Sequence, residues 1–237
     1  YMKLSESDKN FIKENVNKSL DECVDLYNTS KIKLEIVRKF LDNLIFISNE
    51  LKEFNPFVYF GTLLGLTREN NVLKDDDDID LCLNSKFREN VIKKLNNLND
   101  YKINYKVCNK YFVQLTRTKN NINTFVDLYF YIDHDNYIEE KHNFLSSVKL
   151  KTHSLHIPKK LIFPLKKSKN FENVNLPKKP VELCRFLYGS TWRKPLKKNS
   201  GYRMEIVNHK PKLIRRSKLG GITRSIKLLF NNKFQKK

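Results

Sequence analysis

The sequence predicts a layered domain of helices and strands, of the α/β or α+β class. The chain has 237 residues, enough for one substantial domain with a sizeable core but too few for two large ones. Its apolar residues recur first with helical spacing and then in short strand-like runs. The resulting order of helix, strand, helix, strand, helix and further strands is typical of a sheet covered by helices.

The first expected elements lead up to a glycine turn. Residues 30–53 carry apolar side chains at the spacing of an amphipathic helix, which we expect to pack on a sheet. The run from Phe57 to Phe60 is aromatic and β-branched and stops at Gly61, so it predicts a buried strand. Residues 62–68 are then expected to form one or two helical turns.

The middle of the chain predicts the rest of the sheet. Alternating or aromatic character indicates further strands at residues 79–83, 103–108, 111–118 and 124–131. A helix is expected at residues 87–98. After about Asn136 the sequence becomes irregular and rich in lysine and proline, which predicts a loop-rich segment. One short helix is expected there, between Pro180 at its first turn and Gly189 at its end.

The composition is strongly basic. The formal net charge of +20 indicates a polyanionic neighbour, which can be nucleic acid, an anionic membrane surface or phosphorylated substrates. The chain has neither a run of about 18 apolar residues nor a signal-peptide pattern, so we expect a cytoplasmic protein, either soluble or peripheral at a membrane. The four cysteines are scattered without a C-x-x-C motif, which predicts reduced thiols and argues against a zinc site.

A run of acids is the most informative feature of the chain. Five carboxylates occupy the six positions 75–80, and they repel one another unless cations are present. Side chains at i and i+2 of a strand share a face, so Asp78 and Asp80 converge while Ile79 points into the core. Two carboxylates on one face can hold Mg²⁺ or Mn²⁺. The competing interpretation, a solvated acidic turn, leaves the alternating apolar residues of this strand unexplained.

A lone carboxylate, Asp127, lies in the otherwise apolar strand predicted at residues 124–131. An acid in such a setting is rarely buried without a partner. We expect Asp127 to complete the metal ligation or to accept the proton of an attacking hydroxyl, provided that it neighbours the other acids. The alternative is an ion pair with Lys or Arg at a strand edge. Gly61 allows backbone N–H groups to approach phosphate oxygens closely, and Thr62 and Arg68 are further phosphate-binding candidates.

Several motifs occur in a fixed order along the chain. GTLLGLTREN is followed by DDDIDLCL, and further on by IFPL, LP and FLYGSTW. These segments resemble the LicD/fukutin-type branch of the nucleotidyltransferase superfamily, whose members read G-T/S-L-L-G-A-x-R-H, then W-D-D-D-I-D, and later FPL, a proline-led helix and Y-G-x-x-W. The resemblance covers about residues 57–195. It implies the nucleotidyltransferase fold, an α+β architecture with a mixed sheet flanked by helices and a helical or loop-rich C-terminal part.

The resemblance also implies roles for the candidate residues. Gly61 and Thr62 would form the turn that binds the nucleotide phosphates, whereas Asp78, Asp80 and Asp127 would bind divalent metal ions. The family transfers a phosphorylated polyol or amino-alcohol, such as ribitol phosphate or phosphocholine, from a CDP-linked donor such as CDP-choline onto a glycan.

This chain departs from the family pattern in the spacer between the two motifs. Glu69 stands where the family usually has His, Asn71 where it has Gly, and Lys74 with Asp75 where it has Pro-Trp. Because these positions surround the expected donor pocket, we expect the spacer to determine which group is transferred.

The basic charge is concentrated at the C-terminal end. Residues 201–237 hold 11 Lys or Arg and the single acid Glu205, a net charge of +10 that is half of the total. We therefore expect a catalytic domain with N-terminal helices over residues 1–200 and a basic tail over residues 201–237. Within this tail, residues 213–230 mix apolar and basic side chains, which predicts an amphipathic helix that lies on an anionic membrane or packs on the domain.

Three functions compete at this point. The principal hypothesis is a metal-dependent transferase of a phosphorylated alcohol, which acts on a glycan or lipid-linked glycan and releases CMP. The second uses an NTP to nucleotidylate RNA or a small acceptor on the same fold. The third is a non-catalytic nucleic-acid-binding protein, which is disfavoured because it leaves the acidic strand unexplained and because the basic tail lacks interleaved aromatics for stacking on bases.

Overall fold

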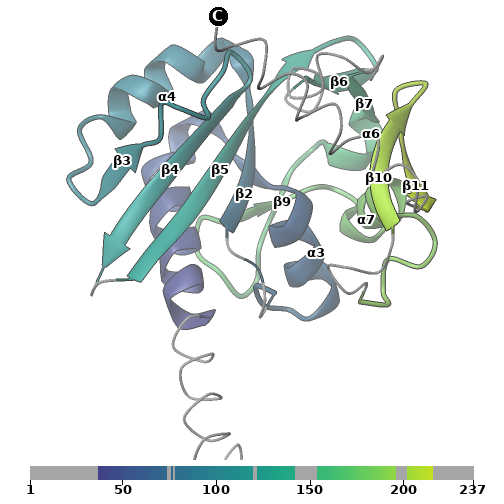
Figure 1. The fold of residues 1–237 in the computed structure, drawn as a ribbon, viewed down its shortest axis with the longest axis horizontal. Coiled ribbons are helices and arrows are strands. Elements are labelled where there is room, and N and C mark those ends of the chain that lie inside the picture. Colours follow the sequence, from purple (N-terminus) through teal and green to yellow (C-terminus); the bar gives the residue numbers. More distant parts are fainter. Residues whose placement is uncertain are drawn as a thin grey trace, which may run out of the picture.

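The structure, a computed structural model, describes residues 37–73, 76, 78–119, 122–141, 154–195 and 202–215 (Figure 1). These residues form a mixed sheet with helices packed beside it, followed by a part made of short strands and helices. The α+β class expected from the sequence is confirmed. The N-terminal portion of the helix expected at residues 30–53 lies outside the described residues, which are helical from 37 to 50.

The central sheet has the strand order β1-β2-β5-β4-β3. The strands along this path are β1 (Phe57–Val58), β2 (Asp78–Asn84), β3 (Tyr101–Ile103), β4 (Phe112–Lys119) and β5 (Ile122–Asp133). β2 and β5 run parallel, whereas the other neighbours on the path are antiparallel. The parallel register pairs Asp80 with Asp127, and the antiparallel register pairs Asp127 with Gln114. Side chains from three strands therefore share one face of the sheet.

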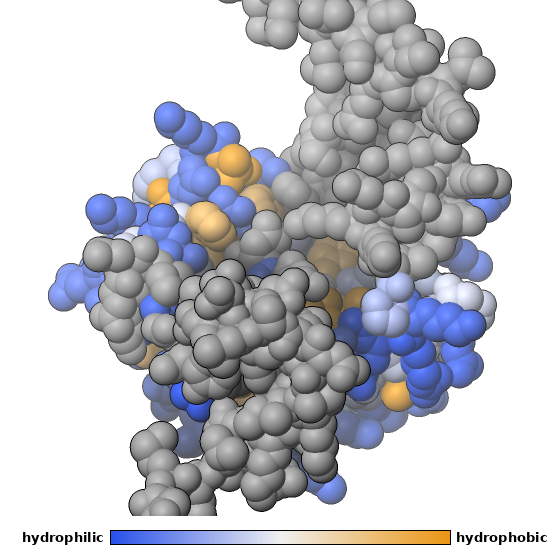
Figure 2. Space-filling view, turned by 60° about the horizontal axis from the view of Figure 1, so that its bottom comes forward, coloured by the Kyte–Doolittle hydropathy of each residue, from blue (hydrophilic) through white to orange (hydrophobic). Residues whose placement is uncertain are grey.

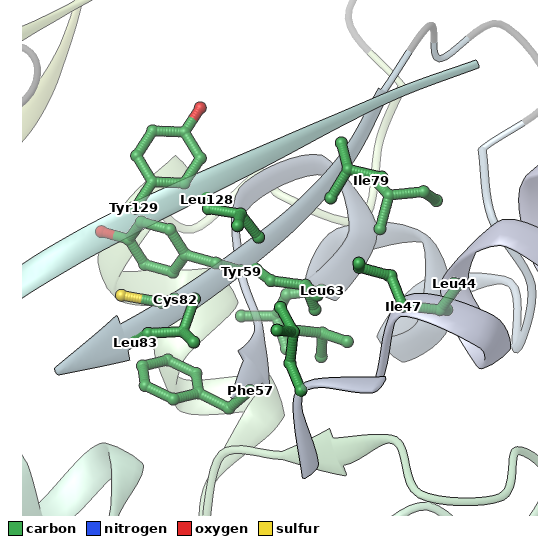
Figure 3. Close-up of a cluster of buried hydrophobic side chains, with 14 of the residues drawn as sticks. Leu44, Ile47, Phe57, Tyr59, Leu63, Ile79, Cys82, Leu83, Leu128 and Tyr129 are labelled. Atoms are coloured by element: carbon green, nitrogen blue, oxygen red, sulfur yellow. The ribbon is translucent and has the colours of Figure 1, made fainter. Parts of the chain in front are cut away.

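The other face of the sheet is covered by the helix of residues 37–50 (Figures 1 and 3). Its buried apolar positions repeat at alternating steps of three and four, as an amphipathic helix requires, and continue just past its end: Val37, Phe40, Leu44, Ile47 and Leu51. In Figure 3, Ile79 of β2 lies beside Leu44 and Ile47 of this helix. Ile79 is fully buried, as the alternation of β2 predicted.

Three helices follow the sheet strands. α3 (Phe60–Arg68) begins two residues after β1 and packs against β2 and against α7 (Pro180–Tyr188). A short 3₁₀ turn, η1 (Lys52–Phe54), precedes β1. A second 3₁₀ turn, η2 (Ser85–Phe87), joins β2 to α4 (Arg88–Leu95). α7 has Pro180 at its first turn and ends at Gly189, where the sequence predicted it.

The C-terminal part contains more strands than the sequence predicted. β6 (Tyr137–Glu140) pairs with β5 and with β7 (Leu155–Pro158), and a single helical turn, α6 (Lys159–Ile162), follows. β8 (Lys166–Lys167) pairs with β9 (Asn175–Leu176), and β10 (Tyr202–Val207) pairs with β11 (Lys210–Arg215). These strands are two to six residues long and mix polar with apolar side chains, so they lack the apolar runs by which strands are recognised in a sequence.

The hairpin of β10 and β11 changes the expectation for the basic tail. Residues 213–215 are the end of β11 and do not begin the amphipathic helix expected at 213–230; the rest of that helix lies outside the described residues. Asn208 and His209 have positive φ angles of 51° and 60°, which suit a two-residue hairpin turn. β11 packs against α7 and β7, so residues 202–215 are part of the domain. Antiparallel pairing stabilises this segment because it satisfies the backbone groups of both strands.

A polar cluster at this hairpin joins three elements. We call it the histidine cluster: His134, Tyr137, Glu139, Ser154, His156 and His209. The rings of His134, Tyr137, His156 and His209 stack in sequence, with centroid distances of 4.5, 4.3 and 3.7 Å. The backbone N–H of His156 donates to the carbonyl of His209 at 3.0 Å, so the cluster fastens the hairpin to β7.

The described surface is mainly polar. Hydrophilic residues cover most of the coloured surface in Figure 2, and hydrophobic residues form small separate groups. Large exposed hydrophobic side chains occur at Tyr105, Val107 and Val207. Every helix in the described part of the chain is too short or too polar to traverse a lipid bilayer. Cys82, Cys108 and Cys184 are free thiols.

Candidate active site

Three carboxylates meet on the face of the sheet opposite the helix of residues 37–50. Asp78 and Asp80 come from the first residues of β2, and Asp127 comes from β5. One carboxylate oxygen from each lies within 4.8 Å of the others. Asp80 and Asp127 are only 4% and 7% exposed, and Asp78 is half-buried. Across the described ranges, no other group of three or more His, Cys, Asp or Glu side chains is arranged closely enough to hold a metal ion.

The turn into α3 holds Asp80 in place. The backbone N–H groups of Gly61 and Thr62 donate to Oδ2 of Asp80 at 2.7 and 3.4 Å. In return, the backbone N–H of Asp80 donates to Oγ1 of Thr62 at 2.9 Å. The turn that the sequence linked to phosphate binding therefore contacts a carboxylate directly. Because a carboxylate has two oxygens, Asp80 can accept these bonds and still ligate a cation.

Gly61 leaves room for the close approach of two acids. A Cβ atom at this position would lie 2.4 Å from Oδ2 of Asp76 and 3.1 Å from Oδ2 of Asp80. The preceding residue, Phe60, has a φ of 29°, a strained conformation that turns the chain sharply from β1 into α3. The ring of Phe60 packs on Tyr129, with centroids 5.1 Å apart, and this contact helps to hold the strained turn.

Asp76 is a fourth carboxylate at the site that sequence reasoning missed. It precedes β2 and so lay outside the predicted strand, yet it extends the same two-residue period as Asp78 and Asp80. Its Oδ2 atom lies over Gly61, and its charge acts on Asp80. The spacing of the three acids was the available signal, because it continues the face of the strand by one step.

The electrostatics of the cluster favour a bound cation. Burial raises the pKa of Asp80 well above its usual value, and the charges of Asp78, Asp76 and Asp127 raise it further, against the hydrogen bond from Gly61. Burial, followed by the charge of Asp80, also raises the pKa of Tyr129 and Tyr188, so both phenols remain protonated donors at neutral pH. A divalent cation among the carboxylates would remove this repulsion. The donor set, made of carboxylate oxygens, fits Mg²⁺ or Mn²⁺.

Two amide side chains support Asp127. Nε2 of Gln114 donates to Oδ1 of Asp127 at 2.9 Å, and Nδ2 of Asn104 donates to Oε1 of Gln114 at 2.9 Å. Neither amide was singled out from the sequence. Their proximity depends on the register of β3, β4 and β5, which no local pattern states.

Arg68 lies at the far end of α3 from the acids. The helical rise places it roughly 10 Å along the axis from Gly61. Nη2 of Arg68 pairs with Oε1 of Glu69 at 2.6 Å. The structure thus brings together Gly61, Thr62 and the carboxylates, but it separates Arg68 from them along the helix.

The domain that carries this site matches a known family. The family model described as "LicD/FKTN/FKRP, nucleotidyltransferase domain" matches residues 54–178, which are 125 of the 237 residues. The chain belongs to the LicD family. A search of curated proteins returned no match.

The matched range of this LicD-family chain contains the carboxylates of the candidate site and the groups that hold them. Gly61, the four carboxylates and the two supporting amides all lie between residues 54 and 178. The motif FLYGSTW, which also resembles the family, lies beyond the matched range and corresponds to the end of α7 and the turn after it. In the LicD-family domain, Glu69 stands where the family usually has His, and here it is the ion-pair partner of Arg68.

Proposed function

We propose that this LicD-family protein is a metal-dependent transferase that moves a phosphorylated alcohol, such as phosphocholine or a polyol phosphate, from a CDP-linked donor to a hydroxyl group of a cell-surface glycan or glycolipid. The observation that carries the proposal is the convergence of Asp78, Asp80 and Asp127 within a domain of this family. Family membership supports a transferase, and the carboxylates support a cation-dependent one.

The proposed cation, Mg²⁺ or Mn²⁺, would be held by Asp78, Asp80 and Asp127. When bound, it supplies positive charge against the oxygens of the donor pyrophosphate. The protein's own contribution is rigidity, because Asp80 is held by Gly61 and Thr62 and Asp127 is held by an amide. Fixed carboxylates need little rearrangement when charge develops on the transferring phosphoryl group.

The proposed reaction is a displacement at phosphorus. The oxygen of the acceptor hydroxyl attacks the phosphorus that carries the alcohol, and a new phosphodiester bond forms. The bond from that phosphorus to the bridging oxygen of the pyrophosphate breaks, and CMP leaves with the bridging oxygen and its electron pair. Asp127 is the proposed base that takes the proton of the attacking hydroxyl.

A screen of donors tests this proposal directly. The protein would be incubated with CDP-choline, CDP-ribitol, CDP-glycerol or NTPs in the presence of Mg²⁺, and binding would be followed by thermal shift and mass spectrometry. We expect stabilisation by a CDP-linked donor and release of CMP when an acceptor is added. Release of pyrophosphate, with the nucleotide left on the acceptor, would replace this proposal with the alternative below.

The alternative is a nucleotidyltransferase that uses an NTP on RNA or a small acceptor. The matching family is described as a nucleotidyltransferase domain, which supports this alternative. The same carboxylates would serve it, because both reactions displace a phosphate-containing group at phosphorus. Product analysis separates the two, since only the principal reaction transfers the phosphorylated alcohol.

We also propose that the basic tail keeps the enzyme near its acceptor at the cytoplasmic side of an anionic membrane. This rests on the net charge of +10 in residues 201–237. Residues 202–215 are a hairpin packed on the domain, so the proposed contact falls mainly on the basic residues after Arg215. Sedimentation with vesicles containing phosphatidylserine tests it: removal of residues 216–237 should abolish cosedimentation, and unchanged cosedimentation would rule the tail out.

A further inference from the structure

We propose that Gln114 is a positioning residue for Asp127, and that Asn104 sets the orientation of the Gln114 amide. The inference rests on the proposed function, because it assigns Asp127 to a bound cation. It concerns residues that lie beside the carboxylates and that no motif identified. Gln114 lies directly opposite Asp127 in the antiparallel register of β4 and β5.

The orientation of the Gln114 amide follows from its two hydrogen bonds. Asn104 presents Nδ2 to Oε1 of Gln114 at 2.9 Å, and Gln114 presents Nε2 to Oδ1 of Asp127 at 2.9 Å. An ionised carboxylate only accepts hydrogen bonds, so the nitrogen of Gln114 has to face Asp127. The donor from Asn104 then meets the oxygen of Gln114. The opposite orientation of Gln114 would place two acceptors together at Asp127 and two N–H donors together at Asn104.

Asn104 is itself held by the turn that joins β3 to β4. Its backbone N–H donates to the carbonyl of Gln114 at 2.9 Å. Its carbonyl accepts from the backbone N–H of Val107 and from Sγ of Cys108, both at 3.1 Å. The turn therefore fixes the backbone position of Asn104. The hydrogen bond from Asn104 then orients the amide of Gln114, which in turn holds the carboxylate of Asp127.

A neutral donor suits a carboxylate that has to bind a cation. Asp127 lies within reach of Asp78 and Asp80, so repulsion favours the rotation of its carboxylate away from them. The N–H of Gln114 opposes this rotation, because it holds Oδ1 in place. A Lys or Arg partner would compensate the negative charge of Asp127, whereas an uncharged amide leaves that charge available to a cation. Asp80 is held in the same manner, by the backbone N–H of Gly61.

The test is a titration of the full-length protein with Mn²⁺ alone, followed by calorimetry, together with donor kinetics. Gln114→Met keeps the size of the side chain but removes both hydrogen bonds, and we expect it to weaken Mn²⁺ binding about 10- to 100-fold. We also expect kcat to fall more than KM for the donor rises, because the hydrogen bond of Gln114 goes to Asp127 and so acts through the proposed cation ligand. Asn104→Asp should turn the amide of Gln114, so it should weaken Mn²⁺ binding in the wild-type background and add little to Gln114→Met.

The control is Asn97→Asp, an exposed residue in a turn, which introduces the same charge change and should leave Mn²⁺ binding unchanged. Circular dichroism establishes that each variant is folded. If Gln114→Met and Asn104→Asp bind Mn²⁺ as tightly as the wild type while Asp127→Asn does not, the positioning role is wrong and the proposed function stands. If the wild-type protein does not bind Mn²⁺ at all, both are overturned.

Discussion

The acidic site and the histidine cluster both gather titratable side chains, but they satisfy them in opposite ways. At the acidic site, Asp80 has three carboxylate neighbours and is held by backbone N–H groups, which carry no net charge. In the histidine cluster, one carboxylate, Glu139, accepts from Ser154, interacts with His134 at 3.1 Å and pairs with Lys141 at 3.4 Å. One region accumulates like charge, and the other surrounds a single charge with polar partners.

The pKa values record this difference. Burial raises the pKa of Asp80, and neighbouring carboxylates raise it further. Burial alone would also raise the pKa of Glu139, but the hydrogen bonds of Ser154 and His134 and the charge of Lys141 outweigh it and lower the pKa. At Glu139 the partners override burial and decide the direction of the pKa shift, whereas at Asp80 burial and the neighbouring acids shift the pKa in the same direction. The comparison teaches that a buried acid surrounded by other acids is a candidate cation ligand, whereas a half-buried acid with its own donors makes a structural contact.

The largest expected effect is the loss of activity when an acid of the acidic site is replaced. Asp80→Asn should remove nearly all turnover, at least about a thousandfold, because it removes a proposed cation ligand and its charge. The fold should persist without added metal, since an Asn oxygen can still accept from Gly61 and the repulsion is smaller. Turnover and thermal unfolding would be measured beside Asp135→Asn, an exposed control that should behave as wild type. Retention of most activity by Asp80→Asn would contradict the assignment.

The next effect is stabilisation by metal. Mn²⁺ or Mg²⁺ at a hundred times its dissociation constant should raise the free energy of unfolding by about 2.7 kcal/mol. Chemical denaturation with and without the ion measures this. The increase should vanish in Asp80→Asn and persist in Glu139→Gln. A similar gain in Asp80→Asn would show that the ion binds elsewhere.

Breaking the histidine cluster should affect stability and leave metal binding unchanged. Glu139→Gln replaces charge-assisted hydrogen bonds with neutral ones, and we expect a loss of about 1–3 kcal/mol in the free energy of unfolding. The hairpin of β10 and β11 should loosen first, because the cluster fastens it to β7. Urea unfolding and hydrogen exchange of the hairpin amides would measure these changes, and an altered Mn²⁺ affinity would contradict the separation of the two regions.

The smallest effect is a pH dependence of stability from the histidine cluster. The pKa of His156 is lowered by burial and by the neighbouring His209, although Glu139 opposes the shift. Below the ordinary value of 6.5, the unfolded chain therefore binds more protons at this position than the folded one, so stability falls as the pH decreases. The lowered pKa of Glu139 adds a second loss below about 4.5, its ordinary value.

This pH dependence can be assigned to its groups. We expect His156→Gln to flatten the decline between about pH 7 and 5.5, and Glu139→Gln to reduce the loss at lower pH. Urea midpoints across the pH range would measure both. The titratable groups that face these two side chains are His134, Lys141 and His209, so single substitutions of these residues provide comparisons. An unchanged slope in His156→Gln would assign the decline to other groups.

Local patterns were sufficient for the elements whose burial follows a simple period. The stripe of the helix at residues 37–50 was right in part: Val37, Phe40 and Leu44 are buried, whereas Leu41 and Ile45 are only half-buried. The alternation of β2 predicted that Ile79 enters the core, and the structure buries it there. The same alternation placed Asp78 and Asp80 on one face. Proline and glycine marked the ends of α7. In each case the signal and the structure lie within about twenty residues.

Local patterns failed where distant segments create the environment. Gln114 and Asn104 belong to no recognisable sequence motif. Only strand pairing places Gln114 beside Asp127 and Asn104 beside Gln114. Asp76 was missed for a local reason, because it lies before the predicted strand. The hairpin of β10 and β11 was missed because apolar and basic residues alternate in it without the strong pattern of a buried strand.

By itself, the sequence determined the family, the class of fold and the acids on β2, because these depend on short motifs and on the two-residue period of a strand. Only the tertiary structure decided that Asp127 joins them, since the parallel pairing of β2 with β5 brings together residues 47 positions apart. The tertiary structure alone also decided how the acids are held. The N–H of Gly61 reaches Asp80 from α3, and the amide of Gln114 reaches Asp127 from β4. The physical reason is that hydrogen bonds and charges act over a few ångströms of space, whatever their separation along the chain.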